Sequence, residues 1–169
     1  LGEVLQGARD LMRGAVNGNA PVARVARVRL HQASGHVRQE ELPLDAEFPR
    51  IDPRRTETAD KCHEHIALLP GTDGALALAL MHELIRNDWL DHDYLANHTL
   101  GWEQLRARAL AWTPERAAQV CGIPVRQIIE LARDYGTTRP AAIRLNYGMQ
   151  RVHGGGNAAR LVACLPALT

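Results

Sequence analysis

Hydrophobic and polar positions follow a helical period through most of the second half of the chain. Between Gly74 and Asn87 the apolar residues are nearly continuous, and Thr72 or Asp73 stands where a helix N-cap is expected. The pattern therefore predicts a helix over 74–87. Further helices are expected at 91–98, 101–110, 114–122, 124–135 with Gly136 as C-cap, and 157–165.

The pattern changes near the end of the chain. Residues 140–145 are mostly apolar, apart from Arg144, and begin with Pro140. They predict a short buried strand. A glycine-rich turn, 148–156, leads from this strand into the last helix. A strand, a glycine-rich turn and a helix in this order are typical of an α/β domain with a ligand at the turn.

The first part of the chain gives weaker signals. A helical stripe of apolar positions covers 1–16, whereas 22–30 mixes valine and arginine with the period of neither a strand nor a helix. We therefore divide the chain into a segment 1–50 and a folded domain 51–169. Residues 12–39 contain arginines and no acidic residue. A solvated face explains such a run, and a phosphate-binding or nucleic-acid-binding arm is the alternative.

Composition narrows the class of protein. The 169 residues are 46% hydrophobic and 23% charged, which excludes a disordered chain. The 20 basic and 19 acidic residues nearly balance, so we expect neither nucleic acid nor membrane as a partner. No apolar run is long enough to span a bilayer, and the non-methionine start and apolar end indicate a fragment of a longer protein.

The number and spacing of the cysteines indicate the redox state of the compartment in which the protein is found. The three cysteines, Cys62, Cys121 and Cys164, are scattered and form no CxxC pair. A reducing, cytoplasmic setting is therefore expected, unless an export signal upstream of this sequence directs the protein to the periplasm.

Two loops combine charge with restricted backbone. In Asp52-Pro53-Arg54-Arg55 a carboxylate is held on a proline-stiffened loop beside two guanidinium groups. The carboxylate suits a guanine or ribose edge and the guanidinium groups suit phosphate, although a solvated turn with local ion pairs explains the same residues. Gly71-Thr72-Asp73-Gly74 begins a helix, where N–H groups attract anions and Asp73 can accept from a ligand base; an ordinary N-cap is the alternative.

Two other classes of site were considered. Cys62, His63 and His65 have ligand types that bind zinc, but a second pair would have to come from His31 and His36 or from His92 and His98. Residues 113–135 have the spacing of a helix-turn-helix, whose second helix would offer Arg126, Gln127, Glu130 and Arg133 to DNA. The near-neutral charge disfavours this DNA-binding alternative.

Three motifs in order carry a family resemblance. They are Ile51-Asp52-Pro53-Arg54-Arg55-Thr56-Glu57-Thr58-Ala59-Asp60, Leu69-Pro70-Gly71-Thr72-Asp73-Gly74-Ala75-Leu76 and Asn146-Tyr147-Gly148-Met149-Gln150. Together they resemble the molybdopterin oxidoreductase family, which contains dimethyl sulfoxide reductases, formate dehydrogenases and nitrate reductases. The resemblance covers 51–169 and implies an incomplete, helix-rich, Rossmann-like doubly wound α/β domain with parallel strands.

The resemblance also implies a cofactor and a set of contacts. The domain would bind one guanosine end of bis(molybdopterin guanine dinucleotide). By position in the motifs, Asp52 and Arg54 would lie at the guanosine and phosphate end, and Asp73 would bond the guanine edge beside Gly71 and Thr72. From the glycine-rich turn, Gly148 and Gln150 would approach the dinucleotide.

The same resemblance implies an enzyme whose catalytic metal ligand lies outside this chain. The full-length protein would be a molybdenum-dependent oxidoreductase, with room for an iron–sulfur cluster and an electron-transfer subunit. Formate, nitrate and S- or N-oxides are all open as substrates, with a formate dehydrogenase-like member favoured. The chain departs from the family in Glu47-Phe48-Pro49-Arg50, where relatives have an apolar strand, in a faint Asn17-to-Pro21 loop, and in Asn146, where many have glycine.

Overall fold

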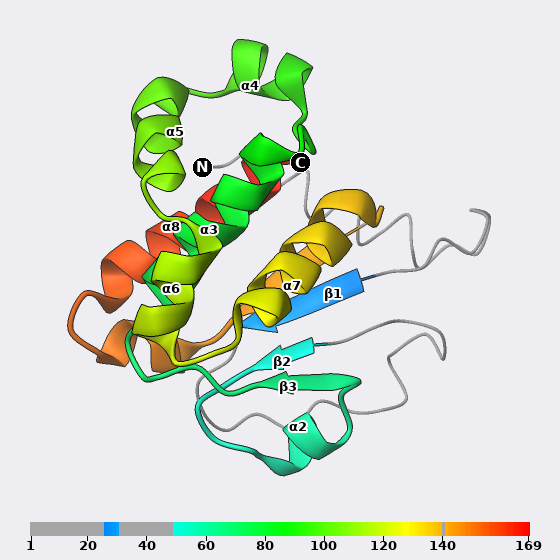
Figure 1. The fold of residues 1–169 in the computed structure, drawn as a ribbon, viewed down its shortest axis with the longest axis vertical. Coiled ribbons are helices and arrows are strands. Elements are labelled where there is room, and N and C mark those ends of the chain that lie inside the picture. Colours follow the sequence, from blue (N-terminus) through cyan, green and yellow to red (C-terminus); the bar gives the residue numbers. More distant parts are fainter. Residues whose placement is uncertain (1–25, 31–48, 140) are drawn as a thin grey trace.

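The molecule is built on a small parallel sheet with helices against it (Figure 1). The structure, a computed structural model, describes residues 26–30, 49–139 and 141–169. The strands are β1 (Ala26–Leu30), β2 (Pro49–Ile51), β3 (Glu64–Ile66) and β4 (Ala141–Leu145). They lie in the order β3-β2-β1-β4, and every neighbouring pair is parallel.

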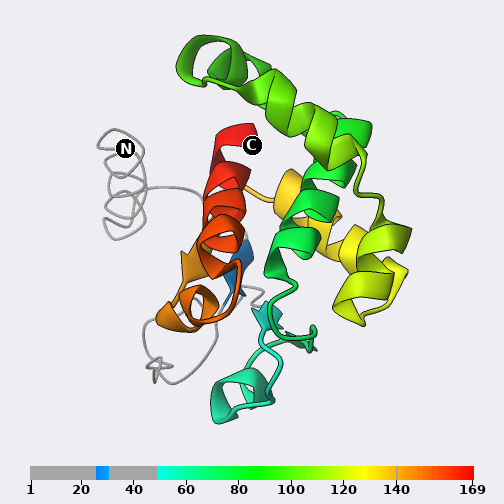
Figure 2. The same cartoon turned by 90° about the vertical axis from the view of Figure 1, so that its left-hand side faces the viewer.

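The strand order makes the sheet doubly wound. From β1 the chain moves outward to β2 and β3, then returns across the sheet to place β4 on the other side of β1. Helices α7 (Val125–Thr137) and α8 (Gly155–Leu168) lie on one face, and the short α2 (Glu57–Asp60) lies on the opposite face (Figures 1 and 2). This confirms the α/β fold class and places the switch in winding direction between β1 and β4.

Three of the strands, β1, β2 and β3, lie in segments whose residues indicate a strand only weakly. β1 falls in the mixed valine and arginine segment, and β2 occupies the position before Asp52 where an apolar strand was thought to be missing. The expectation that this first strand is lacking was therefore wrong: Arg50 is part of β2 and pairs in register with Arg29 and His65. The division at residue 50 stays a prediction, although β2 spans that position.

Helix α3 (Asp73–Arg86) is the centre of the core. Its residues Leu76, Ala79, Leu80, Met81 and Leu84 are at most 1% exposed. Around it pack α5 (Trp102–Leu110), α6 (Pro114–Cys121), α7 and α8, and α4 (His92–His98) lies against the end of α8. A helix made of alanine and leucine suits this position because it is covered on all sides and needs close approach.

Most helix ends agree with the sequence, but one helix end and the burial of one strand differ. Thr113 caps α6 by accepting a hydrogen bond from the N–H of Arg116, and Gly122 ends α6 with a φ of 70°. Gly136 was expected as a C-cap, but it lies inside α7, where an added Cβ would come within 2.8 Å of Leu84 and Trp89. β4 is also only partly buried, because Ala142, Arg144 and Leu145 are exposed.

Several expectations fall on residues that are not described. They are the helix over 1–16, most of the basic run at 12–39, the Asn17-to-Pro21 loop and the pair His31 and His36. Among the described helices, none has the length and apolar character needed to cross a membrane.

Candidate ligand-binding site at the carboxyl edge of the sheet

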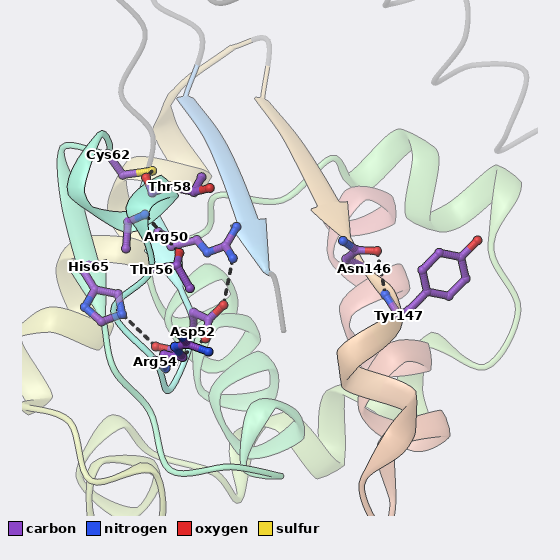
Figure 3. Close-up of polar contacts among 10 residues, drawn as sticks. Arg50, Asp52, Arg54, Thr56, Thr58, Cys62, His65, Asn146 and Tyr147 are labelled. Carbon is purple, nitrogen blue, oxygen red and sulfur yellow. Dashed lines mark hydrogen bonds and ion pairs between the residues drawn. The ribbon is translucent and has the colours of Figure 1, made fainter. Parts of the chain in front are cut away.

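The strands end in register at one edge of the sheet. Leu30 is paired with Ile51 on one side and with Leu145 on the other. The residues that follow β2 and β4, Asp52 and Asn146, therefore emerge at the same edge (Figure 3). In doubly wound sheets ligands bind at this edge, beside the strand where the winding direction reverses.

Asp52 shapes the first loop through contacts of its backbone and its side chain. Its N–H donates to the carbonyl of Ile66 at 3.1 Å, and its carbonyl lies 2.8 Å from Nε2 of His65. Its carboxylate Oδ1 accepts the N–H of Arg54 at 2.9 Å. Because Pro53 disfavours a helical conformation at Asp52, these bonds fix a turn that directs the chain away from the sheet.

The Asp52 carboxylate is also half of a buried ion pair. Nη2 of Arg50 donates to its Oδ2 at 2.8 Å, and the two residues are 1% and 2% exposed. Arg50 and Asp52 are two positions apart, so their side chains share one face of the sheet. Sequence reasoning did not name Arg50 as a site residue, although a charged residue two positions before a strand-end carboxylate is the signal for such a pair.

The two arginines of the loop differ in their contacts. Nε of Arg55 donates to Oδ1 of Asp60 at 2.6 Å, an exposed ion pair between the loop and the last residue of α2. Arg54 is exposed, and its guanidinium makes no ion pair with any residue in the described part of the chain. Of the two, Arg54 has the side chain available for an anionic ligand.

The second loop brings Asp73 to the site at the start of α3. Gly71 adopts a φ of 82°, a left-handed conformation that favours glycine. The Thr72 hydroxyl donates backward to the carbonyl of Leu69 at 2.6 Å, and its side chain makes no cap bond. The ordinary side-chain N-cap considered for this loop is therefore not formed, and the carbonyl of Thr72 accepts from Ala75 and Leu76 instead.

Asp73 is buried with one carboxylate oxygen unused. It is 5% exposed, and its Oδ2 has no hydrogen-bond partner within the described ranges. Burial raises its pKa, its own backbone N–H lowers it, and the nearby charge of Asp52 raises it further.

The third loop follows β4 and closes against the second. Asn146 accepts the N–H of Tyr147 through its Oδ1 at 2.8 Å and so begins a 3-10 helix, η2 (Tyr147–Arg151). Gly148 is buried in this turn, and Gln150 lies on it as well. A Cβ on Gly71 would lie 3.9 Å from Cγ2 of Val152, so the glycine loop and the end of this turn are neighbours.

The seven residues predicted from the motifs therefore lie on three loops at one edge of the fold. The first loop is bonded to the end of β3 through the N–H of Asp52 and the carbonyl of Ile66, and the second loop approaches the third at Gly71 and Val152. The loop from Leu69 to Asp73 is also bonded to the end of α6, because the N–H of Leu69 donates to the carbonyl of Cys121 at 2.8 Å.

The described residues give little support to a zinc site or to a DNA-binding helix. No three histidine, cysteine, aspartate or glutamate side chains of the described residues are grouped to hold a metal ion. In α7, Arg126 pairs with Glu130 at 2.8 Å, Arg133 pairs with Asp134 at 3.1 Å, and Gln127 donates to Glu64 at 2.6 Å. The side chains that would contact DNA are thus engaged within the chain.

Comparisons with known proteins bear on the family. The chain is 35% identical to YoaE, a probable oxidoreductase of Bacillus subtilis, over 83% of its length. It is 34% identical to the dimethyl sulfoxide reductase DmsA of Haemophilus influenzae over 79% of its length, and 34% identical to the F420-dependent formate dehydrogenase subunit alpha of Methanocaldococcus jannaschii over 70%. The chain belongs to the molybdopterin oxidoreductase family.

The structural comparison agrees on the fold. Acetylene hydratase from Pelobacter acetylenicus superposes with a TM-score of 0.74 over 87% of this chain, at 20% sequence identity. No family model matches the chain. The chain spans about a fifth of the length of the family members it matches, covering 20% of YoaE and 19% of DmsA.

Proposed function

We propose that this chain is part of a molybdenum-dependent oxidoreductase and binds one guanosine end of bis(molybdopterin guanine dinucleotide). The observation that carries the proposal is the unpartnered Oδ2 of Asp73, buried at the start of α3 and between the loops that follow β2 and β4. A buried oxygen without a donor is costly in a folded protein, and a ligand that supplies N–H donors removes that cost.

The residues present fit a guanine nucleotide in chemistry and in order. The Watson–Crick edge of guanine offers N–H donors, and an ionised carboxylate such as Asp73 accepts them. Arg54 is exposed and unpaired within the described residues, and it offers planar donors to phosphate. Gly71 and Gly148 keep the backbone free of side chains where a ligand would approach.

Within the whole enzyme this chain would bind and orient, and the bound cofactor would supply the redox chemistry. Asp73 would fix the base, and Arg54 would neutralise phosphate charge. The names of the similar proteins include dimethyl sulfoxide reductases and formate dehydrogenases. An S- or N-oxide or formate is therefore the substrate class proposed for the full-length protein, with the metal ligand supplied by another part of the chain.

The test is the cofactor content of the full-length protein. Asp73→Ala and Arg54→Ala are each expected to reduce the molybdenum and the GMP released by acid hydrolysis, measured per protein by mass spectrometry and chromatography. Arg55→Ala is the matched control, because Arg55 is next in sequence but pairs with Asp60. Full molybdenum and GMP content in both test variants would contradict the assigned roles.

A further inference from the structure

Arg50 is a buried cation with more donors than partners. It is 1% exposed, and its single ion pair uses Nη2. The N–H groups on Nε and Nη1 are buried and have no hydrogen-bond partner among the described residues. A guanidinium placed in this way costs free energy unless its remaining donors are satisfied, since each unpaired buried donor retains its full desolvation penalty.

The direction of the side chain places those donors near the winding switch. In Figure 3 the Arg50 side chain runs from β2 toward the carboxyl end of β1, above Asp52 and on the face that carries α2. β1 lies between β2 and β4, so this is the strand beside which a doubly wound sheet binds its ligand. Arg50 therefore lies at the same edge as Asp52 and Arg54.

The Asp52 carboxylate is already engaged by the chain itself. One oxygen accepts from Arg50 and the other from the N–H of Arg54. These two bonds hold the guanidinium of Arg50 in one orientation and hold the loop that presents Arg54. Asp52 then acts on a ligand through the two arginines that it positions.

We propose that Arg50 donates to separate phosphate oxygens of the guanine nucleotide from Nε and from Nη1, and that Asp52 is the residue that positions it. The proposal rests on the proposed function and adds a contact that the family motifs did not indicate. Phosphate is the favoured partner because it offers several charged oxygens to separate guanidinium N–H groups and because an anion balances the second cation, Arg54. Arg50 and Arg54 would contact the phosphates from the buried and the exposed side of one loop.

The competing explanation is that Arg50 serves only to neutralise Asp52. Removing Arg50 alone does not distinguish phosphate binding from neutralisation of Asp52. The substitution leaves the Asp52 carboxylate buried and unpaired and so destabilises the fold. The informative comparison is between Asp52→Asn, which keeps Arg50, and the double variant Arg50→Met with Asp52→Asn, which removes both charges. An asparagine at 52 retains an oxygen for the N–H of Arg54.

The experiment measures nucleotide affinity in cofactor-free full-length protein by titration calorimetry. The probes are GDP and guanosine, and their affinity ratio isolates the phosphate contribution. Asp52→Asn keeps Arg50 but weakens its positioning, so the ratio is expected to fall only in part relative to wild type. In the double variant it should fall about tenfold to a hundredfold, the range for hydrogen bonds between charged groups. Arg55→Met is the control that should leave the ratio unchanged.

Each outcome decides between the explanations. An equal GDP-to-guanosine ratio in Asp52→Asn and the double variant, with both folded by circular dichroism, would overturn the role of Arg50 and leave the proposed function standing. Wild-type protein that binds neither probe, and that carries no GMP when purified with its cofactor, would overturn the proposed function and this inference with it. Arg50→Lys with Asp52→Asn, which restores the charge but not the planar set of donors, should recover only part of the ratio.

Discussion

Two aspartates at one edge of the sheet show how local contacts separate residues of the same type. Asp52 has both carboxylate oxygens engaged, by Arg50 and by the N–H of Arg54. Asp73 is similarly buried, but its Oδ2 has no donor among the described residues. The first carboxylate is built into the protein, and the second is available to a ligand. Sequence motifs alone assign both to the guanosine and cannot separate these roles.

The unused carboxylate of Asp73 predicts a stability cost that depends on pH. Its pKa is raised above 3.8 by burial, so the folded state holds the proton more tightly than the unfolded state. The cost is absent below the unfolded pKa and grows as pH rises through the folded pKa. Asp73→Asn is therefore expected to raise the melting temperature of cofactor-free protein at pH 7.

The same variant should gain little below about pH 4, where the unfolded carboxyl of the wild type is itself protonated. Thermal melts from pH 3.5 to 8 provide the measurement, with Asp60→Asn on the exposed surface as the control. A stabilisation that does not change with pH would show that the ionised carboxylate is not its cause.

At the scale of elements, the close packing of α7 against α3 depends on one missing side chain. A Cβ at Gly136 would lie 2.8 Å from Leu84 and Trp89, closer than real contacts allow. Gly136→Ala should therefore destabilise the fold by about 1–3 kcal/mol, the range for overpacked cores, although alanine favours a helix.

Urea denaturation of the two proteins measures this difference in unfolding free energy. Gly156→Ala is the matched control, because it lies in the first turn of α8 and an added Cβ there meets nothing within 4 Å. Equal stability of Gly136→Ala and wild type would show that Leu84 and Trp89 adjust without cost.

Helices were predicted well and strands poorly, and the lengths explain why. α3 has 14 residues and α7 has 13, long enough for their periods and caps to be recognised. β2 and β3 have three residues each, too few for an alternation to appear, and Arg50 replaces the apolar residue that would have indicated a strand. Arg50 is tolerated there because Asp52, two positions later, neutralises it, and a pattern of apolar positions does not reveal such a charge pair.

At the scale of the whole molecule, the order of motifs carried more information than any one of them. The loops that follow β2, β3 and β4 were predicted to share a site, and the fold brings them to one edge. Which side chains have donors or acceptors left for the proposed ligand was less accessible to sequence reasoning. Arg50 was missed, and Arg54 and Arg55 could be separated only when the ion pair with Asp60 was seen.

Because this chain covers only a small part of its relatives' length, we expect the chain alone to bind nucleotide weakly. The chain spans 20% of YoaE and 19% of DmsA. A dinucleotide normally contacts several parts of an enzyme. The isolated 169-residue chain should therefore bind GDP more weakly than the cofactor-free full-length protein does. Calorimetry on both proteins makes the comparison, and equal affinities would show that this chain alone contains the nucleotide site.

The pairing of β1 with β4 has a consequence for the order in which the molecule folds. Leu30 and Leu145 are partners across the sheet, yet more of the chain lies between them than between any other paired strands. Parallel pairing at such separation forms slowly, because the intervening helices must condense before the ends meet. The β2–β3 side of the sheet is local and forms early. During synthesis, the edge proposed to bind the nucleotide is therefore completed only after α3 to α7 have emerged and packed, so the proposed binding would be a late event in folding.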